Sequence, residues 1–113
     1  MPRSLCLTRQ CLGLITRIEC EIRPLAGERG LWTLLCAAGM SAAQPSAIKA
    51  QGPFHGPFVA EAVLDSIAQC LAVQGYEPCT EPMIWRLHLQ AELRKLNGER
   101  RRRLGDYQFR PES

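Results

Sequence analysis

Hydrophobic and polar residues alternate along residues 14–23, with a period of two. The hydrophobic side of this pattern also holds one threonine and comprises Leu14, Thr16, Ile18, Cys20 and Ile22. The residues between them are mostly charged and include Arg17, Glu19, Glu21 and Arg23. This period predicts a strand with one buried face and one solvent-exposed face, and Pro24 ends it.

Two further segments favour strands. Residues 31–38 form a nearly continuous apolar run, typical of a buried central strand, and Gly27 and Gly30 before it suit a hairpin connection. Residues 47–51 can add a third strand after Pro45. Residues 1–11 show no clean period, so we expect a loose start or a frayed edge strand there.

A helical period follows a turn rich in glycine and proline. Gly56 suits an N-cap and Pro57 a first helical position. The apolar stripe at helical spacing comprises Ala60, Val63, Leu64, Ile67, Ala68 and Leu71, whereas Glu61, Asp65 and Gln69 fall on the other side. Gly75 suits the C-terminal end. We expect Phe58 to fold back into the core, and the pattern leaves Phe54 open.

The pattern over residues 83–97 fits either a helix or a strand. Trp85, Leu87, Leu89, Ala91 and Leu93 alternate with polar residues, as in a strand, but Trp85, Leu89, Leu93 and Leu96 also form a helical stripe. Strong helix formers dominate and β-branched residues are absent after Ile84, which favours the helix. We expect it to start near Thr80, with Pro82 in its first turn, and to end at Asn97-Gly98 or at Leu104. In a strand, Asn97-Gly98 would form a hairpin turn.

These elements predict an α+β fold, in which an antiparallel sheet of two to three strands packs against two helices on one face. The 113 residues suit a single domain, 1–113, with loosely ordered ends at 1–11 and 106–113. We expect Trp32 and Trp85 in the core. Because so small a sheet has exposed edges, homodimerisation through an edge strand or the second helix is a further hypothesis.

Composition excludes several classes of protein. The chain is 46% hydrophobic and 22% charged, unlike a disordered, collagenous or coiled-coil chain. No apolar run approaches the roughly 20 residues of a membrane span, so we predict no membrane partner. The six cysteines include no C-x-x-C pair, and the N-terminus lacks the features of a secretory signal. We therefore expect a cytoplasmic protein with free thiols, in which Cys20 and Cys70 pack in the core.

Recognisable catalytic motifs are missing from the sequence. It contains no G-x-G-x-x-G, no phosphate-binding loop, no H-E-x-x-H and no G-x-S-x-G. We therefore predict no catalytic residues, no metal and no cofactor. A cysteine-dependent enzyme that pairs Cys36 or Cys79 with His88, and a metal site with Cys6, Cys11 and a histidine, are the weaker alternatives. The interpretation we favour places His88 on a solvated or partly packed helix face.

Positive charge is concentrated at the C-terminal end. Residues 1–85 carry six basic against seven acidic residues, whereas residues 86–113 carry eight against four. The basic residues that could contact nucleic-acid phosphates are Arg94, Lys95, Arg100, Arg101, Arg102 and Arg103. Four successive helical residues point around the axis, so at most two of the four arginines can face one partner. We favour a solvated helix end for the run.

Two function hypotheses follow. The first, which we favour, is a non-catalytic binding or regulatory module. The alternative is a nucleic-acid-binding accessory protein that uses the basic C-terminal segment.

Overall fold

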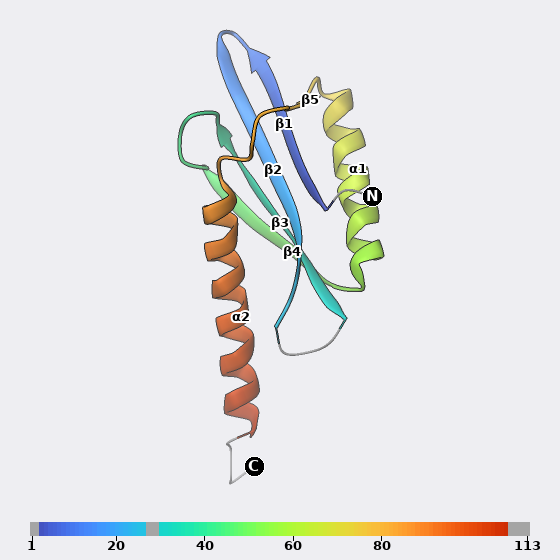
Figure 1. Ribbon diagram of the computed structural model, residues 1–113, viewed down its shortest axis with the longest axis vertical. Coiled ribbons are helices and arrows are strands. Elements are labelled where there is room, and N and C mark those ends of the chain that lie inside the picture. The colour runs from blue at the N-terminus through green and yellow to red at the C-terminus, as the bar shows by residue number, and fades with distance from the viewer. Residues whose placement is uncertain (1–2, 27–29, 109–113) are drawn as a thin grey trace.

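The protein folds as one antiparallel sheet and two helices, which a computed structural model describes for residues 3–26 and 30–108, without the side chains of residues 100–108. Five strands form the sheet in the order β4-β3-β2-β1-β5 (Figure 1). The elements in chain order are β1 (Ser4–Cys11), β2 (Leu14–Pro24), β3 (Leu31–Met40), β4 (Ala47–His55), α1 (Pro57–Val73), β5 (Glu77–Pro78) and α2 (Arg86–Gln108). The predicted α+β class is confirmed, but the expected two to three strands were too few.

The additional strands come from segments whose own pattern is weak. Residues 1–11 were expected to form a loose start or a frayed edge strand, and β1 is a strand that pairs along its whole length with β2, from Ser4 opposite Glu21 to Cys11 opposite Leu14. A tight turn at Leu12 and Gly13, with φ of 54° and 79°, joins the two strands. The two-residue strand β5 lies on the other side of β1. Backbone pairing on both sides stabilises β1 despite its mixed composition.

The two helices lie on opposite faces of the sheet, so the expectation of two helices on one face was wrong (Figure 1). Strand β3 explains this arrangement, because neighbouring residues of a strand point to opposite faces. Leu34 packs in a core cluster with α1, and Leu35 packs in a second cluster with α2. The continuous apolar run of β3 therefore serves two cores.

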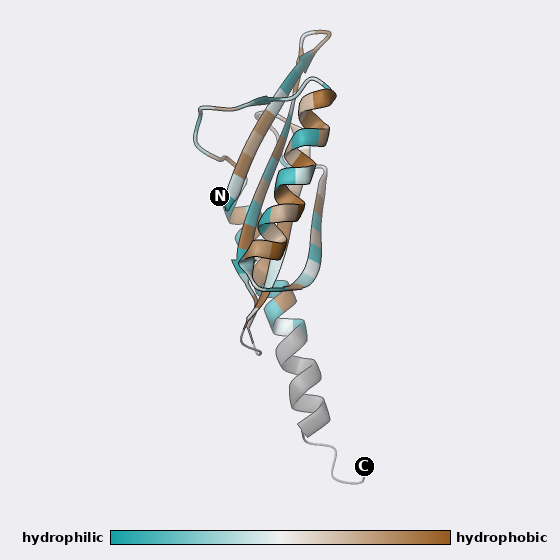
Figure 2. Ribbon diagram, turned by 90° about the vertical axis from the view of Figure 1, so that its right-hand side faces the viewer, coloured by the Kyte–Doolittle hydropathy of each residue, from teal (hydrophilic) through white to brown (hydrophobic). Residues whose placement is uncertain are grey.

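Helix α1 begins and ends where the sequence predicts. Gly56 is the N-cap, Pro57 is the first residue, and Gly75, with φ of 97°, follows the C-cap. Ala60 and Leu64 are buried against the strands, which lie behind the helix in Figure 2, where hydrophobic and hydrophilic positions alternate along it.

Three side chains on α1 depart from the predictions. Glu61 was expected on the exposed side but is buried, where its Oε1 accepts a hydrogen bond of 3.3 Å from Nε of Arg3. Phe58, the second residue of α1, was expected in the core but is 79% exposed, and Cys70, also expected in the core, is exposed as well. The half-buried Phe54 packs on the core instead.

Helix α2 confirms the helical interpretation of residues 83–97, with different ends. It begins at Arg86 rather than near Thr80 and continues to Gln108, past both expected stops. Trp85 just before it is buried, as predicted, whereas Trp32 is partly buried beside the first core. Of the expected loose end 106–113, residues 106–108 belong to α2, and 109–113 lie outside the described residues.

Candidate functional site

The start of α2 is held by a carboxylate from the middle of the sheet. Glu19 on β2 is fully buried, and its oxygens accept hydrogen bonds from the backbone N–H groups of Ile84, at 2.8 Å, and Trp85, at 2.9 Å. Free N–H groups at a helix N-terminus favour a negative charge. This contact explains why the helix begins at Arg86, several residues after Thr80.

A buried arginine pairs with this carboxylate. Nη1 of Arg17 lies 3.1 Å from Oε2 of Glu19 and also donates to Sγ of Cys6 at 2.9 Å. The guanidinium further contacts Ser41 Oγ at 3.3 Å and, at 3.6 Å, the carboxylate of the exposed Glu81. Sequence reasoning placed Arg17 and Glu19 on a solvent-exposed face. The one available signal was their opposite charge at spacing two, which puts both on the same side of a strand.

Helix α2 then packs on the sheet over its first half only. Trp85, Leu89 and Leu93 are buried with Leu35 and Ala37, and Nε1 of Trp85 donates to the carbonyl of Ala43 at 2.8 Å. Farther along, Oδ1 of Asn97 accepts the Ala26 N–H at 2.8 Å. The apolar repeat of the sequence stops at Leu96, since its next positions, 100 and 103, are arginines. Beyond this point α2 continues past the end of the sheet (Figure 1).

The basic residues singled out from the sequence all belong to this helix. Arg94 and Lys95 are exposed on α2, directly after the last buried leucine, and neither takes part in an ion pair with another described side chain. Arg100 to Arg103 belong to the backbone of α2, and their side chains lie outside the described residues. The structure therefore brings the six residues onto one helix, in two neighbouring groups.

The edges of the sheet carry features that discourage pairing with another strand. The outer strand β4 presents the exposed Lys49 and the cis Gly52-Pro53 peptide, and its register with β3 shifts between Trp32 and Leu34. The opposite edge, β5, has two residues, one of them Pro78. Charged residues, prolines and irregular or very short strands are the usual protection of a sheet edge. Homodimerisation through an edge strand stays a prediction that these features do not favour.

The shallow clefts among the described residues include one beside β1 and one beside β4. The larger, of about 300 Å³, is lined by residues that include Arg9, Gln10 and Glu77. Arg9 in it already donates to the carbonyl of Gln74 at 3.2 Å and lies over the ring of Tyr76 at 5.0 Å. The smaller, of about 170 Å³, lies between Leu25, Gln51 and Leu96. Ligand pockets usually range from about 300 to 1,000 Å³, so both clefts are small for an organic ligand.

Two pairs of cysteines lie close to each other in the folded chain, which sequence reasoning missed. Cys20 on β2 faces Cys36 on β3, and the Cys6 thiol on β1 donates a hydrogen bond to Cys79, the residue directly after β5. A hydrogen bond from the Cys20 thiol lowers the pKa of Cys36 and, with burial, raises that of Cys20. Burial and the bond to Cys79 raise the pKa of Cys6 to about 11.

The cysteine–histidine pair and the metal site, the two weaker alternatives, show no such facing arrangement among the described residues. His88 is half-buried on α2, and Cys11 is exposed at the end of β1. Among the side chains that the structure describes, in residues 3–26 and 30–99, no group of three metal-binding residues comes together. Neither described helix combines the length and hydropathy needed to cross a bilayer.

Comparison with known proteins gives one match. The family model described as "PA4575-like protein" matches residues 1–113, the whole chain. No curated protein and no solved structure matches this chain.

Proposed function

The chain belongs to the family of PA4575-like proteins, whose description names no activity, and we propose that it is a non-catalytic binding module that docks nucleic acid along helix α2. The observation that carries the proposal is the division of α2 into a half that packs on the sheet and a half that extends beyond it. We place this module in the cytoplasm, where its thiols would stay reduced.

The length of α2 suits the docking of a helix on a nucleic acid. Its 23 residues span about 35 Å, at 1.5 Å a residue. An α-helix fits the major groove of duplex DNA, and its cations can contact the flanking phosphates. In Figure 1, no strand lies in front of or behind the C-terminal half of α2, and this leaves room for a partner.

Charge supports the same surface. Residues 86–113 hold eight basic and four acidic residues, and Arg94 and Lys95 are exposed where the helix leaves the sheet. The competing explanation is a solvated run of charges, although no basic residue lies in the last turn of α2, where the helix dipole acts. Binding of nucleic acid adds an expectation that the competing explanation lacks, namely an affinity that falls steeply with salt.

The test is fluorescence anisotropy of a labelled duplex DNA and a labelled single-stranded RNA, at about 50 and about 200 mM salt. We expect binding that weakens strongly at the higher salt concentration. Serine at all four positions Arg100 to Arg103 should weaken binding and flatten the salt dependence. An unchanged affinity, or no binding at low salt, would overturn the proposal and favour a protein partner.

A matched pair of single substitutions locates the surface. Arg94→Ser should weaken binding roughly three- to tenfold at low salt and reduce the salt slope by about 1. Lys49→Ser is the control, because it removes the same charge from β4. Lys49 lies opposite Cys36, on the face of the sheet that α1 covers, so this substitution should change affinity less than about twofold. Equal effects of the two substitutions would show attraction by net charge rather than docking on α2.

A further inference from the structure

Cys20 and Cys36 occupy a position in the sheet where two side chains approach closely. The register of β2 and β3 is unbroken from Thr16 opposite Met40 to Pro24 opposite Trp32. Just beyond the two ends of this paired region, backbone hydrogen bonds of 2.9 Å join Ser41 N–H to the Ile15 carbonyl and Leu25 N–H to the Leu31 carbonyl. Hydrogen-bonded and non-hydrogen-bonded pairs alternate along antiparallel strands. Cys20 and Cys36, five positions from each of these two pairs, are therefore a non-hydrogen-bonded pair.

Such a pair has the geometry that a disulfide needs. The Cα atoms of a non-hydrogen-bonded pair lie about 4.5 Å apart, with their side chains on the same face. A disulfide requires Cα atoms about 4.4 to 6.8 Å apart. Both side chains pack in the same core cluster, Cys20 as a buried member and Cys36 against it. A bond between the two sulfurs thus requires little movement of the backbone.

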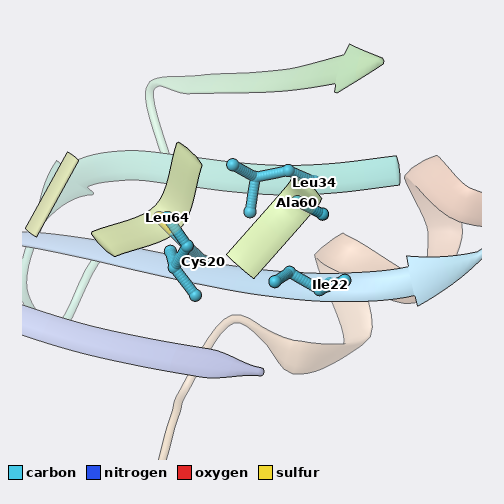
Figure 3. Packing of buried hydrophobic residues seen from close by; sticks show 5 residues of the cluster. All are labelled: Cys20, Ile22, Leu34, Ala60 and Leu64. Atoms are coloured by element: carbon cyan, nitrogen blue, oxygen red, sulfur yellow. The ribbon is translucent and has the colours of Figure 1, made fainter. Parts of the chain in front are cut away.

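The two thiols differ in their access to solvent. Cys20 is fully buried and lies beside Leu64 of α1, as Figure 3 shows, whereas Cys36 is partly exposed on the neighbouring strand. We propose that this pair is an oxidation site, at which a hydroperoxide reacts with Cys36 and Cys20 then closes a disulfide between β2 and β3. The inference is independent of the nucleic-acid proposal.

The reaction takes two steps, and its atoms and electrons balance. The Cys36 thiolate attacks one oxygen of the hydroperoxide, an S–O bond forms, the O–O bond breaks, and the leaving oxygen takes up a proton. The Cys20 sulfur then attacks the Cys36 sulfur, the S–S bond forms and the S–O bond breaks, and hydroxide leaves with the Cys20 proton as water. Two thiols lose two electrons, and the hydroperoxide is reduced to water and an alcohol, or to two waters from hydrogen peroxide.

The direction of the pKa shifts agrees with these roles. The hydrogen bond from Cys20 lowers the pKa of Cys36, which increases the thiolate fraction of the more accessible sulfur. Burial and the bond to Cys79 raise the pKa of Cys6 to about 11, which reduces its thiolate fraction near neutral pH. Backbone N–H of Cys79 donates to the Cys6 carbonyl at 2.9 Å, so Cys6 and Cys79 are a hydrogen-bonded pair, with Cα atoms about 1 Å farther apart. Cys20 and Cys36 should therefore react first.

Peptide mapping tests the proposal directly. The reduced full chain is treated with a few equivalents of hydrogen peroxide at neutral pH, blocked with N-ethylmaleimide and digested with trypsin. Cleavage after Arg17, Arg29 and Lys49 places Cys20 and Cys36 in separate peptides, each with one cysteine. We expect these peptides to be joined by a reducible bond while Cys6 and Cys79 are still blocked by maleimide. Joining of Cys6 to Cys79 alone, or no joined peptide, would overturn the proposal.

Variants separate the two steps. Cys20→Ser should abolish the joined peptide and leave Cys36 as a sulfenic acid that dimedone traps, whereas Cys36→Ser should abolish both products. Cys70→Ser, which removes an exposed thiol on α1, is the matched control and should leave the disulfide unchanged. Because Cys20 is buried, far-ultraviolet circular dichroism of each variant accompanies the mapping. If Cys20→Ser does not fold, the wild-type map together with Cys36→Ser still decides the outcome.

Discussion

The two faces of the sheet hold their helices in different ways. The α1 face is closed by apolar contact among Cys20, Ile22, Leu34, Ala60 and Leu64 (Figure 3), and its one ion pair among the described residues joins the buried Glu61 to an arginine that is half exposed. The α2 face has its own apolar cluster and, in addition, a buried ion pair. The carboxylate of this pair accepts hydrogen bonds from the backbone N–H groups at the start of the helix. Apolar packing is tolerant of small shifts, whereas hydrogen bonds to a fixed carboxylate specify a position. The comparison teaches that α2, the proposed docking helix, is the one whose start is held by a buried side-chain carboxylate, whereas the N-cap of α1 makes no side-chain hydrogen bond.

The largest expected effect comes from removing that carboxylate. Glu19→Ala leaves Arg17 buried without its main partner and leaves the N–H groups of Ile84 and Trp85 without their acceptor. Breaking a buried ion pair on one side costs about 3 to 5 kcal/mol of the free energy of unfolding. Urea denaturation followed by circular dichroism measures this loss.

Glu81 provides the matched control, because it contacts the same arginine from solvent. Its side chain is 75% exposed and lies 3.6 Å from Nη2 of Arg17. Glu81→Ala should cost less than about 1 kcal/mol, as is usual for exposed ion pairs. Equal losses for the two variants would show that burial of Glu19 does not set the stability of the α2 face.

A second substitution probes the α1 face. Leu64→Ala removes a buried side chain that packs on Cys20 and Leu34, and should cost about 2 to 5 kcal/mol. Leu12→Ala, at the 96% exposed tip of the first hairpin, should change stability by less than about 0.5 kcal/mol. Amide hydrogen exchange of Leu64→Ala should rise in α1 while α2 keeps its protection. A rise in both helices would mean that the two faces do not behave separately.

Local patterns in the sequence predicted the elements that carry their own periodicity. The alternation of residues 14–23 identifies β2, the apolar run of residues 31–38 identifies β3, and the stripe from Ala60 to Leu71 identifies α1. Strand β1 lacks such a pattern and is held by its pairing with neighbours on both sides. Pairing is a long-range property, which a local window does not contain.

The same limit applies to the sites. The alternation in β2 correctly separated Arg17 and Glu19 from Cys20 and Ile22, but a strand does not reveal whether a distant helix covers its second face. The start of α2 depends on Glu19, 65 residues before Ile84. Cys20 lies opposite Cys36 because of the register between β2 and β3. That register could be predicted only if the conformation of the turn between the two strands were known. By contrast, the exposure of Arg94 and Lys95 follows from the phase of their own helix.

The smallest expected effect concerns pH and the cysteine next to the buried ion pair. Burial and the hydrogen bond to Cys79 raise the pKa of Cys6 to about 11, above the roughly 8.5 of an unperturbed thiol. The folded state therefore keeps the proton of Cys6 at a pH where the unfolded chain has lost it. The resulting stability is fully present below about pH 8.5 and is lost as pH rises toward 11. Because Cys6 is partly exposed, screening by solvent limits the loss to about 1 kcal/mol.

Urea unfolding between pH 8 and 11 measures this loss as a difference between variants, because other groups titrate in the same range. Cys6→Ser removes the thiol and should flatten the decline of stability with pH, whereas Cys11→Ser, at an exposed position, should keep the wild-type slope. Parallel declines for Cys6→Ser and the wild type would mean that the Cys6 proton is not held by the fold. In that case Arg17, 2.9 Å from the sulfur, would stabilise the thiolate enough to cancel the effect of burial. The α2 face would then hold a second reactive thiol, and Cys6 would compete with Cys36 for oxidants.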